Sequence, residues 1–185
     1  MNLRSRISAA CLALALAAPA AYAQDLPHGG LKGDALNAFF RGEHITIYAP
    51  PDQPVTLIDS HEVYGGVALA GARYDWVLLQ SGGHPCQYTL EFDDPRTTVE
   101  FNRSRLVAGP SGVTHPVWTA TAQDSAGDTL SKVGEARIAS YADVPANHFT
   151  LSGPGIKRIV FWGDDRGVDG FCNVVIDTVN TITPG

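Results

Sequence analysis

The stretch Gln87-Tyr-Thr-Leu-Glu-Phe92 alternates strictly between polar and apolar side chains. Successive side chains of a β-strand point to opposite faces of the sheet, so Tyr88, Leu90 and Phe92 share one face while the polar residues share the other. This stretch therefore predicts a strand with one face in the protein core and one face in water.

The same alternation extends along the chain and gives Val99 and Phe101 inward-facing positions, with Trp118, Ala120 and Ala122 inward on a later strand. Runs of β-branched and aromatic residues are separated at short intervals by Gly, Pro, Asn and Asp, which predicts turns, among them Asp93 to Pro95, Asp124 to Asp128 and Ser152 to Gly155. The expected strands are 44–48, 55–58, 63–69, 76–79, 87–92, 97–102, 117–123, 130–138, 148–151, 157–162 and 171–179.

The helical content is expected to be small. One short helix is predicted from Asp34 to Phe40, with Asp34 as the N-cap. Strands never alternate with helices of about 10 to 15 residues, which disfavours a parallel α/β sheet. The sequence therefore predicts an all-β, antiparallel β-sandwich of jelly-roll type, a single domain over residues 44–182 after an N-terminal extension over residues 24–43.

The first 23 residues have the pattern of a secretory signal peptide. Arg4 and Arg6 precede an apolar run from Ala9 to Ala18, and Ala21-Tyr22-Ala23 forms a small-x-small cleavage site. A segment this short does not cross a bilayer core of about 30 Å as a helix, so we expect no membrane span. The predicted localisation is secreted or periplasmic.

The charge balance excludes nucleic acid as an expected partner. The chain of 185 residues has 13 basic and 19 acidic residues, and the signal peptide carries two of the basic ones, so the mature charge is 11 − 19 = −8. Nucleic-acid binding needs a concentrated basic surface. The two basic pairs, Arg103 with Arg105 and Lys157 with Arg158, are expected on solvated strand edges.

Two cysteines, Cys86 and Cys172, remain after the signal peptide. An oxidising compartment favours their pairing, and both have the parity of apolar neighbours on their predicted strands. We therefore predict a Cys86–Cys172 disulfide, with two buried free thiols as the alternative.

Several segments from Tyr88 onward, including Tyr88 to Pro95, Val99 to Phe101, Ala120 to Gly127 and Phe149 to Ile156, together resemble galactose-binding-like jelly-roll domains of secreted bacterial proteins. Ile159 to Phe161, Gly170-Phe171 and Val175 to Asp177 complete the resemblance, which spans about residues 78–179. It implies a carbohydrate-binding or adhesion module, and in some members a structural calcium ion held near the end of the last strand, where Asp177 is the matching position.

A noncontiguous calcium site is expected from Asp177 with Asp59 or Glu62 if the first and last strands lie together. The alternative is that Asp177 accepts hydrogen bonds from loop amides at a strand end. The histidines are scattered without metal-binding spacing, and no other cofactor is indicated.

The function predicted first is an exported binding or adhesion module, with carbohydrate as the first ligand class and an extracellular protein as a further partner. Tyr74, Trp76 and Trp162 are the candidate ligand-binding residues, because each aromatic ring lies beside acidic residues near a strand end. No nucleophile motif such as Gly-x-Ser-x-Gly is present, so no catalytic residue is named. A secreted hydrolase with spatially paired carboxylates and a structural or protein-interaction domain remain the alternatives.

Overall fold

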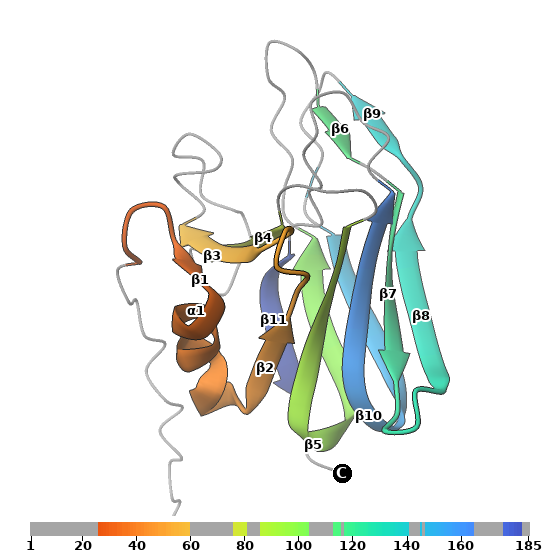
Figure 1. Ribbon diagram of the computed structural model, residues 1–185. Coiled ribbons are helices and arrows are strands. Elements are labelled where there is room, and N and C mark those ends of the chain that lie inside the picture. Colours follow the sequence, from red (N-terminus) through yellow and green to blue (C-terminus); the bar gives the residue numbers. More distant parts are fainter. Residues whose placement is uncertain are drawn as a thin grey trace, which may run out of the picture.

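The computed structural model describes residues 26–59, 76–80, 86–103, 113–115, 117–140, 145, 147–164 and 176–182. These residues are mostly in antiparallel β-strands, with one short α-helix, α1 (Gly33–Phe40), and one 3-10 turn, η1 (Arg41–Glu43) (Figure 1). The strands are β1 (Leu31–Lys32), β2 (Ile45–Tyr48), β3 (Val55–Asp59), β4 (Trp76–Gln80), β5 (Cys86–Arg103), β6 (Val113–His115), β7 (Val117–Gln123), β8 (Thr129–Glu135), β9 (Ile138–Ser140), β10 (Asn147–Asp164) and β11 (Ile176–Ile182).

Nine strands form one hydrogen-bonded sheet in the order β1-β3-β4-β11-β5-β10-β7-β8, with β2 paired to β5, while β6 and β9 form a separate pair. The sheet is folded over into two layers. The front layer contains β2, residues 86–92 of β5, residues 158–164 of β10, β7 and β8. The back layer contains β1, β3, β4, β11, residues 98–103 of β5 and residues 147–152 of β10.

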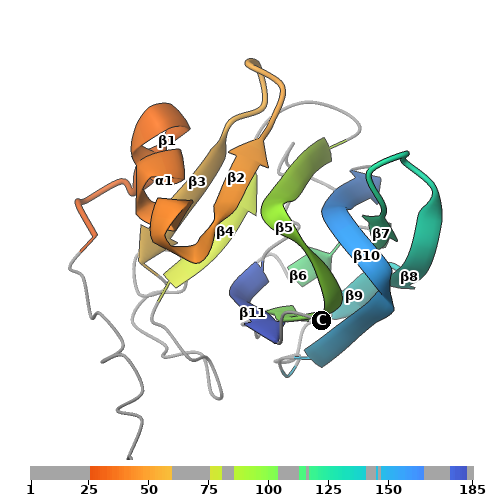
Figure 2. The ribbon, with the colours of Figure 1, turned by 90° about the horizontal axis from the view of Figure 1, so that it is seen from below.

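The fold-over occurs where β5 and β10 bend together at the lower end of the molecule in Figure 1, and Figure 2 shows the two strands side by side. Register shifts in β10 lie between Ser152 and Arg158. Gly155 adopts a φ of 78°, the left-handed region that favours glycine. The Lys157 ammonium donates to the backbone carbonyls of Phe92 and Asp93, at 2.5 and 3.0 Å, and so satisfies acceptors at the bend.

The two turns predicted at Asp93 to Pro95 and Ser152 to Gly155 are therefore bends inside continuous strands of 18 residues each. Proline and glycine are suited to such positions because strands use them at bulges and bends, where the ladder is already interrupted. The turn predicted at Asp124 to Asp128 is confirmed. The Asp124 carboxylate accepts from the amides of Ala126 and Asp128, both at 2.9 Å.

The core lies between the layers and is dominated by aromatic rings. Directly opposed rings within a layer are stacked: Tyr88 on Phe161 at 4.9 Å and Phe101 on Phe149 at 5.5 Å between ring centroids. Rings from different layers meet edge to face, as Phe101 does with Phe161 and with Trp118. This geometry is the one that the ring quadrupoles prefer, and it joins the two layers into one interior.

The predicted inward set is confirmed, since Tyr88, Leu90, Phe92, Val99, Phe101, Trp118, Ala120 and Ala122 are all buried. Burial raises the pKa of the Tyr88 hydroxyl well above its ordinary value. The parity of the buried side chains changes from even numbers before the bend of β5 to odd numbers after it, as a strand passing from one layer to the other requires.

Helix α1 begins one residue earlier than predicted, at Gly33, so Asp34 lies in the first turn rather than at the N-cap position, which Lys32 occupies. Leu36 and Phe40 lie on one face of the helix and are buried. Asn37 faces the outer edge of β2, where it accepts from the Ile47 amide at 2.8 Å and donates to the Ile47 carbonyl at 3.3 Å. The helix thus occupies backbone groups that an edge strand would otherwise expose.

Within the described part of the chain, no helix has the length and apolar character needed to cross a membrane.

Candidate functional site

The outward-facing surface of the front layer, called here the front face, carries the most distinctive set of accessible side chains. Its members alternate with buried core residues on β2, β5, β7 and β10, and two further members lie on the edge strand β8. All of them are half-buried or exposed: Thr46, Tyr48, Gln87, Thr89, Glu91, Thr119, Thr121, Gln123, Lys132, Gly134, Arg158, Val160 and Trp162.

The strand register arranges the front face in three rows that run across the strands. The lower row is Thr46, Glu91, Arg158 and Gln123. The middle row is Tyr48, Thr89, Val160, Thr121 and Lys132. The upper row is Gln87, Trp162, Thr119 and Gly134.

Two aromatic residues stand on this face. Trp162 lies on β10 between buried Phe161 and buried Gly163, which places its own side chain outward, where it is half-buried. Tyr48 ends β2, and 54% of it is exposed, making it the large hydrophobic residue that the described chain leaves most open to solvent. An aromatic residue at an accessible position is a candidate contact residue, because its ring is apolar and flat.

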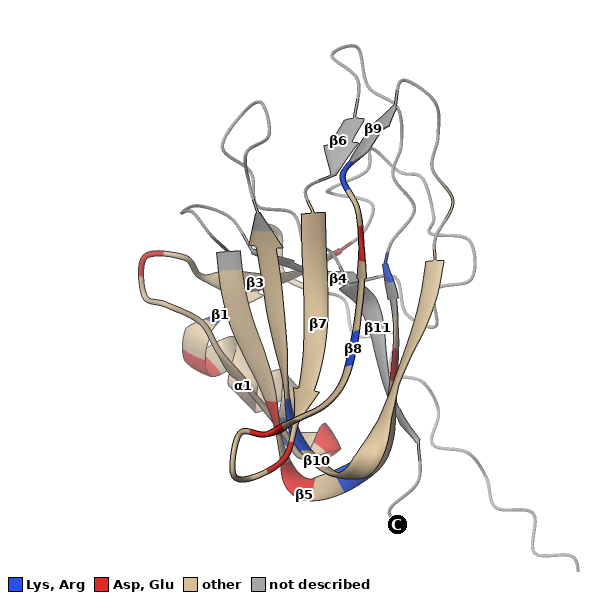
Figure 3. Ribbon diagram, turned by 90° about the vertical axis from the view of Figure 1, so that its right-hand side faces the viewer, with Lys and Arg blue, Asp and Glu red and all other residues tan. Residues whose placement is uncertain are grey.

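The charges of the front face are confined to its margins. Glu91 and Arg158 are directly opposed in the lower row, and Lys132 ends the middle row on the edge strand β8. Figure 3 shows that charged residues also gather at the lower end, where β5 and β10 bend. The centre of the face is therefore made of uncharged groups, namely hydroxyl, amide and aromatic side chains and the aliphatic side chain of Val160.

Gly134 interrupts the upper row at the edge of the sheet. A β-carbon built there would lie 2.3 Å from the Trp118 carbonyl oxygen and 3.1 Å from the Thr119 methyl group. Close approach of β7 therefore requires glycine at this position. The consequence for the front face is that no side chain stands beyond Thr119 in this row.

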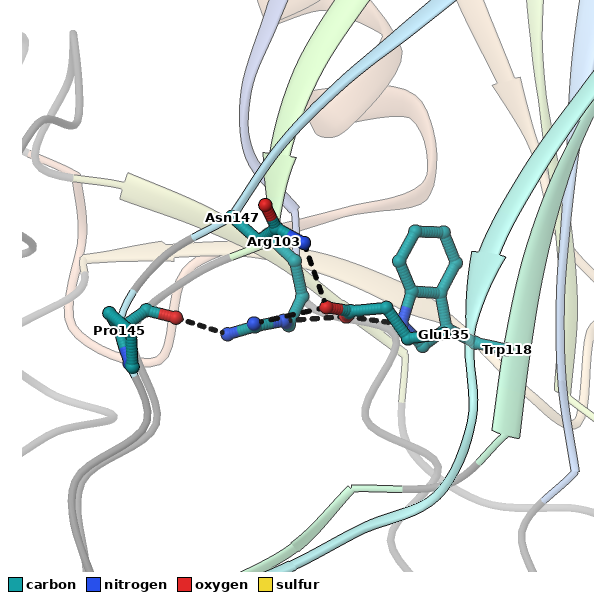
Figure 4. Close-up of polar contacts among 5 residues, drawn as sticks. All are labelled: Arg103, Trp118, Glu135, Pro145 and Asn147. Carbon is teal, nitrogen blue, oxygen red and sulfur yellow. Dashed lines mark hydrogen bonds and ion pairs between the residues drawn. The ribbon is translucent and has the colours of Figure 1, made fainter.

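Behind the face, at the upper end of the sandwich, an ion pair between buried Arg103 and half-buried Glu135 links the two layers (Figure 4). Arg103 of the back layer is 3% exposed. Its guanidinium donates two hydrogen bonds to the Glu135 carboxylate of the front layer, at 2.7 and 3.2 Å, and a third to the Pro145 carbonyl at 2.9 Å. The prediction that Arg103 lies on a solvated strand edge is wrong. After the bend of β5 the odd-numbered side chains face the interior, and Arg103 is one of them.

Glu135 is held by two further donors, the Trp118 indole at 3.0 Å and the Asn147 amide at 3.0 Å. Burial by itself raises the pKa of the Glu135 carboxyl, but the hydrogen bonds from Arg103, Asn147 and Trp118 and the charge of Arg103 outweigh burial, so the pKa lies below its ordinary value. Each oxygen of the Glu135 carboxylate accepts two hydrogen bonds. We therefore assign this cluster a structural role beneath the front face.

The three predicted ligand-binding residues are not brought together by the described structure. Trp162 lies on the front layer, whereas the backbone of Trp76 lies in β4 of the back layer, opposite Asp59. Tyr74 lies outside the described residues. Trp162 lies within β10, as the predicted strand 157–162 has it, and the strand continues beyond it to Asp164.

The predicted calcium site and disulfide remain predictions. Asp59 ends β3 and Asp177 lies in β11, on either side of β4, and Glu62 lies outside the described residues. Cys86 begins β5 opposite Gly163, and Cys172 lies outside the described residues. Among the residues that the structure describes, no group of three or more His, Cys, Asp and Glu is arranged to hold a metal ion.

Sequence reasoning missed Tyr48 and the rows of threonines as members of one surface. The signal was present in the alternation, because Thr89, Thr119 and Thr121 are the outward partners of predicted core residues. What the alternation lacks is the strand order that places β2, β5, β10 and β7 side by side.

A small apolar pocket of about 230 Å³ lies apart from the front-face rows, between α1, β2 and the start of β3. It is lined by Gly33, Leu36, Ile47, Ala49, Pro50, Pro51, Pro54 and Val55. Its volume is below the range of about 300 to 1,000 Å³ that is usual for small-molecule sites.

No protein-family model matches this sequence, and no curated protein matches it. Among solved structures, the chain is similar to TmCBM61 in complex with β-1,4-galactotriose, with 9% identity and a TM-score of 0.44 over 78% of this chain and 94% of that chain. It is also similar to arabinose-bound MgGH51 α-L-arabinofuranosidase, with 14% identity and a TM-score of 0.42 over 73% of this chain, and to the enzymatically active domain of bacteriophage CBA120 tailspike protein 4, with 14% identity and a TM-score of 0.39 over 75% of this chain. This chain covers 22% and 19% of those two chains.

Proposed function

We propose that this protein is an exported carbohydrate-binding module whose ligand lies on the front face. The observation that carries the proposal is the combination of two accessible aromatic residues, Tyr48 and Trp162, with a floor of threonine and glutamine side chains between and beside them.

The chemistry of this face suits a sugar. The C–H surface of a sugar ring is apolar and packs on a flat aromatic side chain, while its hydroxyl groups donate and accept hydrogen bonds. Threonine hydroxyls also act in both directions, and a glutamine amide offers both a donor and an acceptor. A face of these residue types therefore pairs with a polyhydroxylated ligand without burying an unpaired charge.

The export signal, the periplasmic or extracellular location and the galactose-binding-like jelly-roll class belong to the same proposal. They are supported by the N-terminal sequence pattern and by the segment resemblance between residues 78 and 179. A carbohydrate-binding module is preferred to a hydrolase because accessible aromatic and threonine side chains, rather than carboxylates, are the most frequent described groups on this face.

The proposal is tested by screening the purified mature chain on a glycan array and then comparing variants on the glycans that bind. Trp162→Ala is expected to lower affinity about tenfold or more, since a buried aromatic contact in a binding site is commonly worth over 1 kcal/mol. Thr150→Ala, at an exposed position on the outer surface of the back layer, is the matched control and should bind normally. Absence of binding to every glycan, or equal binding by Trp162→Ala, would contradict the proposal.

A further inference from the structure

The positions of the two aromatic residues constrain the length of the ligand. Tyr48 and Trp162 lie on β2 and β10, with β5 between them, and their rows are two residues apart along the strands. Strand spacing and rise place their backbones ~12 Å from each other. This separation favours a ligand that extends over more than one sugar ring.

The same line continues across the sheet without meeting a charge. From Tyr48 it passes over Thr89 and Val160 to Trp162, and from there along the upper row over Thr119. It leaves the sheet at Gly134, where no side chain closes the row. Glu91 and Arg158 lie off this line in the lower row, and Lys132 ends the middle row.

We infer that the front face binds an interior segment of a linear, uncharged polysaccharide, which crosses the strands from Tyr48 on β2 to Gly134 on β8. The inference rests on the proposed function and extends it from carbohydrate in general to chain interiors. Because the path is open at the β8 edge, a polysaccharide can extend past the site there and does not need to bind by its chain end. A path lined by uncharged side chains leaves an anionic polymer without a dedicated partner.

Length dependence tests this inference. Binding of the mature chain is measured by calorimetry with β-1,4-linked galactose, glucose and xylose, each as a ladder from one to six units, and with the same hexasaccharides reduced to alditols at the reducing end. For the sugar that binds, affinity should rise at least about tenfold between two and six units, because only longer ligands contact both aromatic residues. Reduction of the chain end should leave the hexasaccharide affinity unchanged.

Two pairs of variants locate the path. Tyr48→Ala should weaken hexasaccharide binding severalfold yet leave disaccharide binding unchanged, whereas Trp162→Ala should weaken both. Thr119→Glu and Gln123→Glu add the same charge at two outward positions of β7, one on the path and one in the lower row. The first should lower hexasaccharide affinity and the second should not.

Equal affinity for one and six units, or loss of binding when the chain end is reduced, would overturn the inference while leaving carbohydrate binding intact. Equal effects of Thr119→Glu and Gln123→Glu would also overturn the path. Failure of all three ladders and of every array glycan would overturn both the inference and the proposed function.

Discussion

The two ends of the sandwich each hold a basic side chain between strands, and they do so in different ways. At the upper end, buried Arg103 meets the Glu135 carboxylate and joins the two layers. At the lower end, half-buried Lys157 meets backbone carbonyls at the bend of β5. The planar guanidinium fits a carboxylate with two parallel hydrogen bonds, while the compact ammonium fits carbonyls that converge from several directions.

The difference shows that the environment of each cation is determined by strand topology and not by the local sequence. Each cation belongs to a pair of nearby basic residues, Arg103 with Arg105 and Lys157 with Arg158, and both pairs were expected on solvated strand edges. Topology separates them, because residue 103 ends β5 at the upper end of the sandwich, whereas residue 157 lies at the bend of β10. Substitutions at Arg103 and Lys157 therefore test one end of the sandwich against the other.

The largest effect is expected at the upper end. Arg103→Met should lower the free energy of unfolding by about 2 kcal/mol, because it removes the charged donor of two hydrogen bonds to the half-buried Glu135 carboxylate. Urea denaturation measures the change. The double variant Arg103→Met/Glu135→Met should recover part of the loss, since it removes both charges. If the double variant were less stable than the single one, the ion pair would not be the cause.

A smaller effect is expected at the lower end. Lys157→Met should lower the free energy of unfolding by about 1.5 kcal/mol, because water can replace part of the two hydrogen bonds to Phe92 and Asp93. The control is Lys132→Met, an exposed lysine on β8, which should change stability little. A loss at Lys157 that equals or exceeds the loss at Arg103 would reverse the ranking of the two ends.

The two ends should also differ in their dependence on pH. The pKa of Glu135 is lower in the folded state than its ordinary value of 4.5, so its contribution to stability is complete above that value. The contribution is lost as the pH falls through the folded-state pKa. Glu135→Gln should flatten the acid limb of a stability profile, whereas Lys157→Met should leave the slope unchanged. Parallel acid limbs for wild type and Glu135→Gln would contradict this assignment.

The smallest effect concerns His44, beside the lower bend. His44 has a φ of 58°, and its imidazole lies 3.4 Å from the exposed Asp93 carboxylate. His44→Ala and His44→Gly both remove that contact, but only glycine accommodates the left-handed backbone. The glycine variant should therefore be more stable than the alanine variant by about 1 kcal/mol in thermal unfolding. Equal stabilities would mean that the backbone relaxes at this corner.

Much of the fold could be predicted from alternation and turn residues. The inward parity of Tyr88, Phe101 and Trp118 follows from alternation, which is a local property of a strand. The continuity of β5 through Pro95 could not be predicted, because proline and two aspartates favour a turn wherever no partner strand bends with them. Here β10 bends alongside β5, and the two strands remain paired on both sides of the bend.

The candidate site was predicted less completely, and for a physical reason. Trp162 could be recognised from its own neighbours, but the front face is built from strands that are remote in sequence. Tyr48 and Thr119 belong to the same surface only because β2 and β7 flank the β5 and β10 pair. Pairwise register of this kind is set by the folded chain as a whole.

The passage of β5 and β10 through both layers has a mechanical consequence. Neither layer can be peeled away while the other stays whole, because β5 and β10 run through both layers and are paired with each other in both. Loosening of the surface that carries Trp162 must therefore disturb the opposite surface as well. Unfolding should proceed as a single cooperative step, with heat absorption in one calorimetric peak.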